Sequence, residues 1–143
     1  MISAAIAKQE SNGNYKAIGK PVNGDVALGK YQIMKKNLPS WSQEALGRKV
    51  SVTEFMTTPE IQDAIAKFKM NQYYMKYKSP ADVASMWFSG RPLRNNKSFD
   101  KVSNLSTPNY VSSVLKHLSA VIDKANNPQT PNNTPVVVLG SRG

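Results

Sequence analysis

Three pairs of a hydroxyl residue and a proline restrict the fold of this chain more than any other feature. The pairs are Thr58-Pro59, Ser79-Pro80 and Thr107-Pro108. The hydroxyl of a helix N-cap accepts a hydrogen bond from a backbone N–H of the first turn, and a proline at the first helical position has no N–H to leave unpaired. The pairs therefore predict that a helix begins directly after each of them.

Apolar residues after these pairs recur at the spacing of an α-helix. Positions i, i+3, i+4 and i+7 share one face of a helix. The helix after Pro108 has the clearest stripe, which consists of Val111, Val114, Leu115, Leu118 and Ile122. Gly90 and Pro92 end the helix that begins at Pro80. The chain is therefore expected to be mainly helical.

Two other segments predict helices by different signals. Ile2, Ala5 and Ile6 have helical spacing and predict a first helix that ends at a Ser-Asn-Gly-Asn run. Ser51 and Glu54 form a capping box, which predicts a short helix after Ser51.

Residues 17–28 predict the β structure of the chain. Asn23-Gly24 lies between β-branched residues, a pattern typical of a β-hairpin turn. The segment is expected to form a small, irregular hairpin between the first two helices. The second helix is predicted to begin within residues 28–32 and to end at residues 37–39. The fold class expected from the residues is mainly α with a minor β element.

The 143 residues divide into one domain and a tail. A chain of this length can bury a core of its own without disulfides. Residues 1–125 hold the periodic segments and form the predicted domain. Residues 126–143 begin with an aperiodic run of Asn, Pro and Thr and predict a flexible tail. Within it, Val136–Leu139 is either a docking strand or an apolar patch of a disordered end.

Charge and cysteine content limit the possible functions. Nineteen Lys and Arg against nine Asp and Glu give a net charge of +10, and the chain has no Cys. The missing thiol excludes a disulfide framework, a thiolate nucleophile and Cys-ligated zinc. The positive charge favours a polyanionic partner, which is nucleic acid, anionic lipid or a cell-wall polymer. No apolar run is long enough to predict a membrane span.

Carboxylates are the remaining candidates for catalysis. The single histidine, His117, has no fixed carboxylate partner in the pattern, so no metal site is expected. Glu10 ends an apolar helix and begins a polar loop. A half-buried carboxyl at such a place has a raised pKa and acts as a general acid. The alternative is a solvated glutamate at a helix end.

Four segments, in order along the chain, resemble motifs of soluble lytic transglycosylase domains of the lysozyme-like superfamily. They are Glu10-Ser11, Ala27–Met34, Trp87–Pro92 and Thr107–Leu115. The likeness extends from Ile2 to about Asp123 and is nearest to the enzymes of phage particles and of secretion and conjugation systems. It implies a lysozyme-like α+β fold, in which a helical bundle surrounds a catalytic helix and carries a small irregular β-hairpin.

The resemblance also implies a reaction. The family cuts the β-1,4 bond between N-acetylmuramic acid and N-acetylglucosamine in bacterial peptidoglycan. Glu10 would act first as the acid and then as the base, and the 6-hydroxyl of the sugar would close a 1,6-anhydro ring. No cofactor and no metal are implied.

Six further site residues follow from the resemblance: Ser11, Tyr31, Gln32, Met34, Trp87 and Tyr110. Tyr110 would orient the Glu10 carboxyl through its hydroxyl. Gln32 would donate a hydrogen bond to the substrate, and Tyr31 would offer an aromatic platform. Met34 and Trp87 would line the site or belong to the core. Ser11 would support the loop or contact a sugar.

Alternatives to a transglycosylase remain at this point. A hydrolytic lysozyme needs a second carboxylate or a positioned water, and Asp25 is its candidate, although Asn-Gly-Asp is also a common turn. A basic nucleic-acid module is a second alternative, but no nucleic-acid-binding motif supports specific binding. A structural virion protein, docked through its tail, is a third.

The expected location follows from the missing targeting signal. The segment before Glu10 has no signal-peptide pattern. We therefore expect delivery by a phage particle that acts in the periplasm or wall of its host, with host cytoplasm before release as the alternative. The tail would then bind other proteins of the virion or of an envelope machine.

Overall fold

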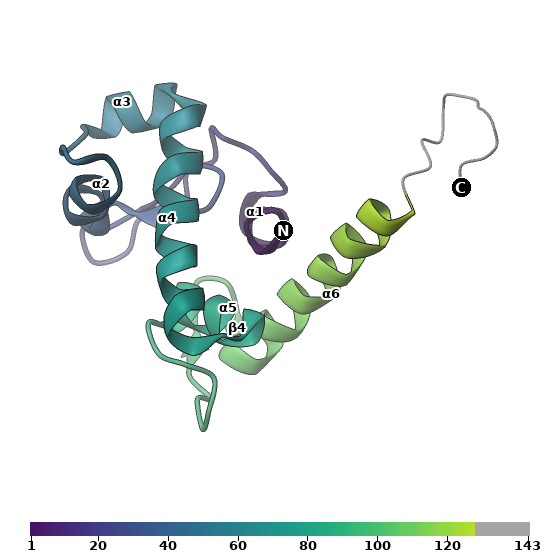
Figure 1. The fold of residues 1–143 in the computed structure, drawn as a ribbon. Coiled ribbons are helices and arrows are strands. Elements are labelled where there is room, and N and C mark those ends of the chain that lie inside the picture. The colour runs from purple at the N-terminus through teal and green to yellow at the C-terminus, as the bar shows by residue number, and fades with distance from the viewer. Residues whose placement is uncertain (128–143) are drawn as a thin grey trace.

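The computed structural model describes residues 1–127 (Figure 1). Six helices occur there: α1 (Ile2–Ser11), α2 (Leu38–Leu46), α3 (Val52–Thr57), α4 (Pro59–Tyr77), α5 (Pro80–Ser89) and α6 (Thr107–Asn126). The strands are β1 (Ala27–Leu28), β2 (Ile33–Met34), β3 (Phe99–Asp100) and β4 (Leu105–Ser106), and η1 (Lys35–Asn37) is a 3-10 turn. The prediction of a mainly α fold is confirmed. Apart from its first residues, the predicted tail, with Val136–Leu139, lies outside the described residues.

The helix starts agree with the capping signals, with two corrections. At α4 the predicted N-cap Thr58 makes no side-chain cap hydrogen bond. The side chains of Ser51 and Ser79 accept hydrogen bonds from backbone N–H groups of the helices that follow them. At α6 the N-cap is Ser106, one residue earlier than predicted, and its hydroxyl accepts from the N–H of Asn109. Thr107 is instead buried and packs its hydroxyl against that of Ser98, at 2.8 Å.

The segment from residue 28 to 39 is not the predicted helix. β1 pairs with β2 in an antiparallel ladder, and the Gly29 and Gln32 backbones between them have φ of +78° and +54°. Such left-handed backbone cannot continue an α-helix. The helix α2 begins at Leu38, where the predicted helix was expected to end. The predicted turn at Asn23-Gly24 is confirmed by the bridge between Val22 and Asp25.

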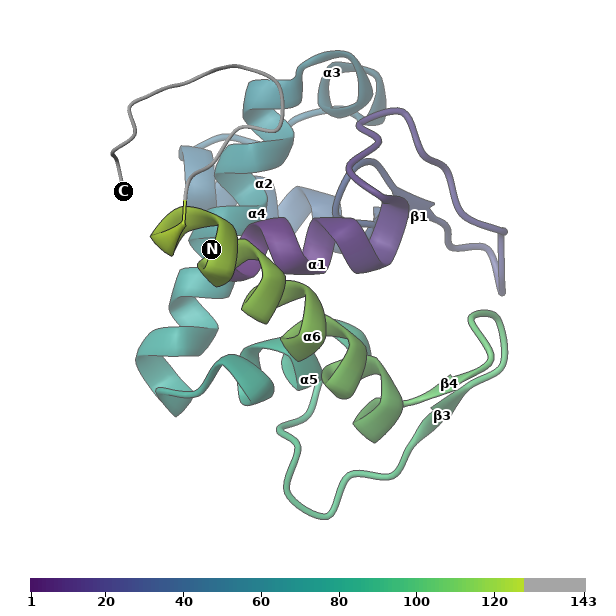
Figure 2. The same ribbon diagram turned by 90° about the vertical axis from the view of Figure 1, so that its right-hand side faces the viewer.

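A second hairpin, which the sequence pattern did not predict, is formed by β3 and β4. Phe99 pairs with Ser106, and Asp100 pairs with Leu105. Each strand has only two residues, too few to produce a visible alternation of apolar and polar side chains. The first hairpin comprises residues 17–34, which include the Asn23-Gly24 turn, β1 and β2. This hairpin and the β3–β4 hairpin project to the same side of the molecule (Figure 2).

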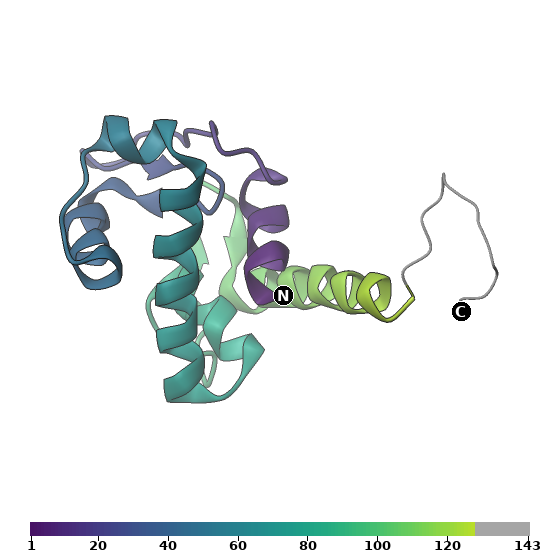
Figure 3. The ribbon, with the colours of Figure 1, turned by 45° about the horizontal axis from the view of Figure 1, so that its top comes forward.

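The core is centred on α1, which lies between α4 and α6 (Figures 2 and 3). Ala5 and Ile6 of α1 have no exposed surface. Small side chains at the middle of α1 allow its neighbours to approach closely, and the end of α1 is thereby held between the helices and the hairpins. Within residues 1–127, no helix is long and apolar enough to cross a membrane.

Candidate active site

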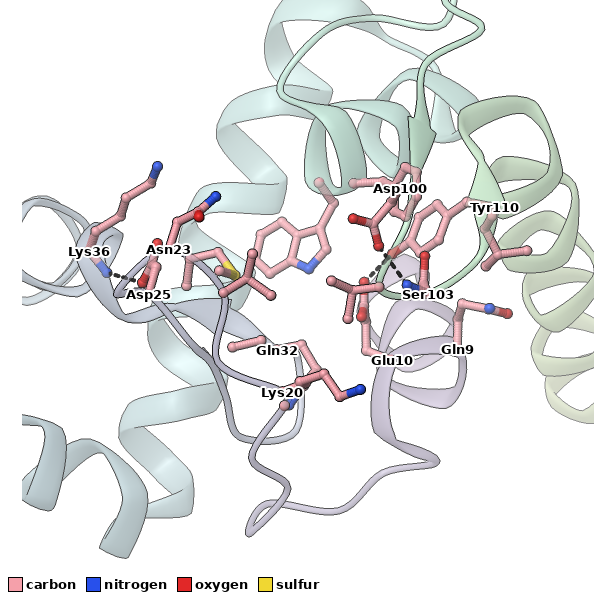
Figure 4. A pocket seen from close by; sticks show the side chains of 18 residues that line it. Gln9, Glu10, Lys20, Asn23, Asp25, Gln32, Lys36, Asp100, Ser103 and Tyr110 are labelled. Atoms are coloured by element: carbon pink, nitrogen blue, oxygen red, sulfur yellow. Dashed lines mark hydrogen bonds between the residues drawn. The ribbon is translucent and has the colours of Figure 1, made fainter.

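A cleft of about 540 Å³ lies between the end of α1, the two hairpins, α5 and the start of α6 (Figure 4). Its polar lining consists of Gln9, Glu10, Lys20, Asn23, Asp25, Gln32, Lys36, Asp100, Ser103 and Tyr110. Its larger apolar lining residues are Val22, Met34, Trp87, Phe88, Val102 and Leu105. A cleft with apolar walls and several polar groups is typical of a site for a ligand that has both polar groups and apolar surface.

Glu10 is at the last turn of α1, which Asn12 ends in a left-handed backbone conformation with φ of +56°. Its Oε2 accepts a hydrogen bond of 2.7 Å from the hydroxyl of Tyr110, 100 residues later in the chain. Burial raises the pKa of Glu10 to about 7, the hydrogen bond from Tyr110 lowers it in part, and the charge of Asp100 raises it. Glu10 is therefore a carboxyl that carries a proton in a large fraction of molecules at neutral pH.

Tyr110 holds the Glu10 carboxyl from the first turn of α6. Its side chain is 2% exposed, and its ring stacks on Phe88 with centroids 4.3 Å apart and planes inclined by 18°. Burial, followed by the charge of Glu10, raises the pKa of Tyr110 well above its usual value. The phenol therefore remains a hydrogen-bond donor. The prediction that Tyr110 hydrogen-bonds Glu10 is confirmed.

Gln32, Met34 and Trp87 line the cleft. Gln32 differs from its predicted role because its Nε2 donates to the backbone carbonyls of Gly29, at 3.0 Å, and Ala17, at 3.4 Å. Its donors thus hold the hairpin, and its Oε1 lies toward Gly19, where a Cβ would approach it to 2.9 Å. Since Nε2 is engaged in this way, Oε1 is the polar atom of Gln32 left for a hydrogen bond at the cleft.

Trp87 connects the cleft to the protein interior. Its indole Nε1 donates to the backbone carbonyl of Tyr31 at 3.0 Å, and its ring lies 5.4 Å from that of Trp41. A tryptophan held at its N–H keeps a fixed orientation. One part of the ring is thus a rigid apolar wall of the cleft, and another part belongs to the core.

Neither Tyr31 nor Ser11 lines the cleft, which corrects the predicted aromatic platform at Tyr31 and the sugar contact considered for Ser11. Tyr31 is 2% exposed, and its hydroxyl donates to Asp63 at 2.7 Å. A buried phenol that finds an acceptor is stable in the core, so Tyr31 offers no aromatic platform. Ser11 donates to the carbonyl of Lys30 at 2.6 Å, which fits the loop-supporting alternative.

Asp25 lies at the opposite end of the cleft from Glu10 (Figure 4). Its Oδ1 accepts from the backbone N–H groups of Val26 and Lys36, at 2.9 and 3.1 Å. These bonds connect the hairpin to the segment after β2, as expected of a turn residue. Its position does not place it beside Glu10 as the second carboxylate of a lysozyme.

Asp100 is the cleft carboxylate that the sequence pattern missed. It lies on β3, and its Oδ2 accepts from the N–H of Ser103 at 2.8 Å. The Asp-x-x-Ser-Asn sequence at this turn was the only available signal, and it is common in surface turns.

Other polar groups at the cleft have supporting contacts. His117 of α6 contacts Gln9 through Nε2 and Oε1, 3.1 Å apart, and Gln9 precedes Glu10. Among residues 1–127, His, Cys, Asp and Glu side chains form no group of three or more that could hold a metal ion.

The raised pKa of Glu10 predicts a stability that depends on pH. Between pH 4.5 and 7 the folded protein binds more protons at Glu10 than the unfolded chain does, so the free energy of unfolding falls as the pH rises through this range. A pKa change from 4.5 to about 7 corresponds to about 3 kcal/mol. We expect Glu10→Gln to be the more stable protein at pH 8 and nearly equal to wild type at pH 4. Urea unfolding at both pH values measures the difference, and an equal difference at both would contradict the prediction.

Comparisons with protein-family models, with curated proteins and with solved structures found no match for this chain.

Proposed function

We propose that the protein is a peptidoglycan lytic transglycosylase with a lysozyme-like fold. The observation that carries the proposal is the half-buried Glu10 carboxyl, which has a pKa of about 7 and is oriented by Tyr110 in a cleft. The four motifs in the sequence resemble those of this family, and the contact between two of them, Glu10 with Tyr110, supports the proposal independently of the motif order.

The reaction begins with a proton transfer. The Glu10 carboxyl donates its proton to the glycosidic oxygen as the bond from that oxygen to the anomeric carbon breaks, and the electron pair stays on the oxygen. The N-acetyl group of the muramic acid stabilises the positive charge at the anomeric carbon. An acid whose pKa lies near the operating pH is protonated in part of the molecules and still donates its proton readily.

The second step returns the proton to Glu10. The 6-hydroxyl oxygen of the same sugar bonds to the anomeric carbon, its proton passes to the Glu10 carboxylate, and a 1,6-anhydro ring closes. One carboxyl serves both steps because its pKa lies near the operating pH. Tyr110 keeps the carboxyl in one orientation throughout.

The lining of the cleft supports a glycan as the ligand. Trp87 and Met34 supply apolar surface for the carbon faces of sugars, while Asn23 and the Oε1 of Gln32 supply polar groups for hydroxyls. Lys20 and Lys36 supply positive charge for the carboxylates of the peptide stems. The net charge of +10 adds a salt-sensitive attraction to the anionic envelope.

The biological setting belongs to the same proposal. The motifs are nearest to those of enzymes of phage particles and of secretion and conjugation systems, and we place the protein in the first setting, with action on the host cell wall during genome delivery. Peptidoglycan is then the principal partner, and virion or envelope-machine proteins would bind the tail.

The products of digestion test the proposal. Purified peptidoglycan, treated with the full-length protein and analysed by mass spectrometry, is expected to yield fragments that end in anhydromuramic acid, one water lighter than hydrolysed fragments. Glu10→Gln, treated in parallel, should yield neither type. Release of no fragments by the wild-type protein would contradict wall cleavage.

Hydrolysis by a lysozyme-type mechanism is the second candidate. It is favoured by one observation, the presence of a second carboxylate, Asp100, in the same cleft as Glu10. Water would then replace the 6-hydroxyl as the nucleophile, and its proton would pass to a carboxylate. Fragments with reducing ends only would establish this outcome in the same experiment.

A further inference from the structure

We propose that Asp100 is the second functional carboxylate of the cleft, and that its ionised side chain stabilises the positive charge that develops on the cleaved sugar. This inference rests on the proposed glycan cleavage. It assigns to β3 a role that the motif resemblance does not include, since Asp100 lies between the third and fourth motifs.

The position of Asp100 is the first support. Asp100 comes from the β3–β4 hairpin, Glu10 comes from the end of α1, and both carboxyl groups line one cleft (Figure 4). Their charges interact, because Asp100 contributes to the raised pKa of Glu10. A sugar bound beside Glu10 therefore lies within the electrostatic reach of Asp100.

The orientation of Asp100 is the second support. Oδ2 is held by the N–H of Ser103 at 2.8 Å, while Oδ1 accepts no hydrogen bond from the part of the chain that the structure describes. One oxygen thus fixes the side chain, and the other is left for a ligand. A charge fixed in advance stabilises a transition state without the cost of reorganisation.

The base of the hairpin is anchored to the protein interior. The N–H of Thr107 donates to the carbonyl of Ser98 at 2.7 Å, directly beyond the β3–β4 pair. Ser98 in turn donates to the side chain of Asn96, which is 2% exposed. These partly buried bonds hold the two-residue strands in register, so the position of Asp100 is fixed by contacts beyond its own turn.

Within residues 1–127, the other elements around Glu10 contribute no second carboxylate beside it. From α6, Tyr110 stays neutral and His117 contacts Gln9 rather than Glu10. From the first hairpin, Lys20 lines the cleft. The residues of α5 at the cleft, Trp87 and Phe88, carry no charge.

The step assigned to Asp100 forms and breaks no bond. When Glu10 gives its proton and the glycosidic bond breaks, positive charge is shared by the anomeric carbon and the ring oxygen. The negative charge of the Asp100 carboxylate lowers the energy of that positive charge, an effect that a partly apolar cleft strengthens. It acts together with the N-acetyl group of the substrate.

The test compares Asp100→Asn with a matched variant, Asp123→Asn, which removes the same charge from an exposed position on α6. Both full-length proteins are assayed for release of soluble fragments from peptidoglycan across a range of pH. We expect Asp100→Asn to lower kcat about 100-fold with little change in KM. The alkaline limb of its pH profile should also move to lower pH, because the pKa of Glu10 falls when the neighbouring charge is removed. Asp123→Asn should behave as wild type.

A second variant separates this role from a structural one. Asp100→Ala leaves space for a small anion, and sodium formate is expected to restore part of its activity, which loss of a purely structural contact would not allow. Wild-type activity in Asp100→Asn, or a loss with an unmoved pH profile and no formate rescue, would overturn the inference. The same holds if Asp25→Asn, rather than Asp100→Asn, moves the pH profile.

The outcomes also distinguish the two proposals. If the wild-type protein releases no fragments, the proposed glycan cleavage fails. If the wild type is active and Asp100→Asn matches Asp123→Asn, the cleavage stands and only the role of Asp100 fails.

Discussion

Replacement of Glu10 by glutamine is expected to reduce glycan cleavage by about 1,000-fold, within the range of general acid–base catalysis. Glutamine has nearly the same shape and can still accept a hydrogen bond from Tyr110, but it cannot donate a proton that it then takes back. The departing sugar would then leave as an alkoxide, which is a far poorer leaving group than the neutral alcohol. Release of soluble fragments from purified peptidoglycan measures the loss.

A matched control for Glu10→Gln is Glu60→Gln, which makes the same change at an exposed position in the first turn of α4. Co-sedimentation with insoluble peptidoglycan should be equal for both variants and wild type, because attraction by the basic surface does not depend on Glu10. A nucleic-acid-binding module would release no fragments from peptidoglycan in the wild-type protein, so Glu10→Gln would have no cleavage activity to reduce. Wild-type rates of fragment release in Glu10→Gln would falsify the proposed mechanism.

The helices of this fold were predictable because their signals are local. A cap residue and a proline act within one turn, so α4 and α5 begin where the sequence predicts. The helix α6 begins one residue early, because Thr107 is taken into the buried contact with Ser98, and Ser106 replaces it as the cap. A contact between residues distant in the sequence thus determines which of two adjacent hydroxyl residues is the N-cap, and a local sequence pattern does not contain that information.

The central pair of the site was also predictable, but only by resemblance. Glu10 and Tyr110 are 100 residues apart, and no periodicity connects them. Their hydrogen bond was predicted from the roles that the family resemblance implies for the two residues. The same resemblance misplaced Tyr31, which lies between β1 and β2, because its side chain faces the core toward Asp63, an acceptor on α4.

The β structure was least predictable. The strands have two residues each, and their positions depend on left-handed backbones at Gly29 and Gln32 and on the contacts of those loops. Asp100 was missed for the same reason. Its role depends on where the β3–β4 hairpin lies relative to α1, which is set by buried bonds around Asn96 and Thr107.

Substitution of Gly29 by alanine is expected to lower the free energy of unfolding by about 3 kcal/mol. The φ of +78° at Gly29 costs an L-residue about 1 kcal/mol. A Cβ there would also overlap the side-chain amide of Gln62, which is fully buried, and overpacking of this kind costs about 1–3 kcal/mol. Gln62 cannot move cheaply, because it accepts from the N–H of Lys30 and donates to the carbonyls of Tyr15 and Phe55. A lower melting temperature, by about 10 °C, is the expected readout for a chain of this size.

Gly47 supplies the control for Gly29→Ala, since its φ is +76° and an added Cβ there meets no atom within 4 Å. Gly47→Ala should therefore cost only the backbone part, about 1 kcal/mol. In a Gln62→Ala background the overlap at residue 29 is removed, so Gly29→Ala should then cost no more than Gly47→Ala. Equal effects of Gly29→Ala and Gly47→Ala in the wild-type background would contradict the claim that Gln62 fixes this loop. A larger loss of stability in Gly29→Ala than in Gly47→Ala would mean that the buried amide of Gln62 holds the β1–β2 connection against α4. That connection carries Gln32, so the same contact would also position one wall of the cleft.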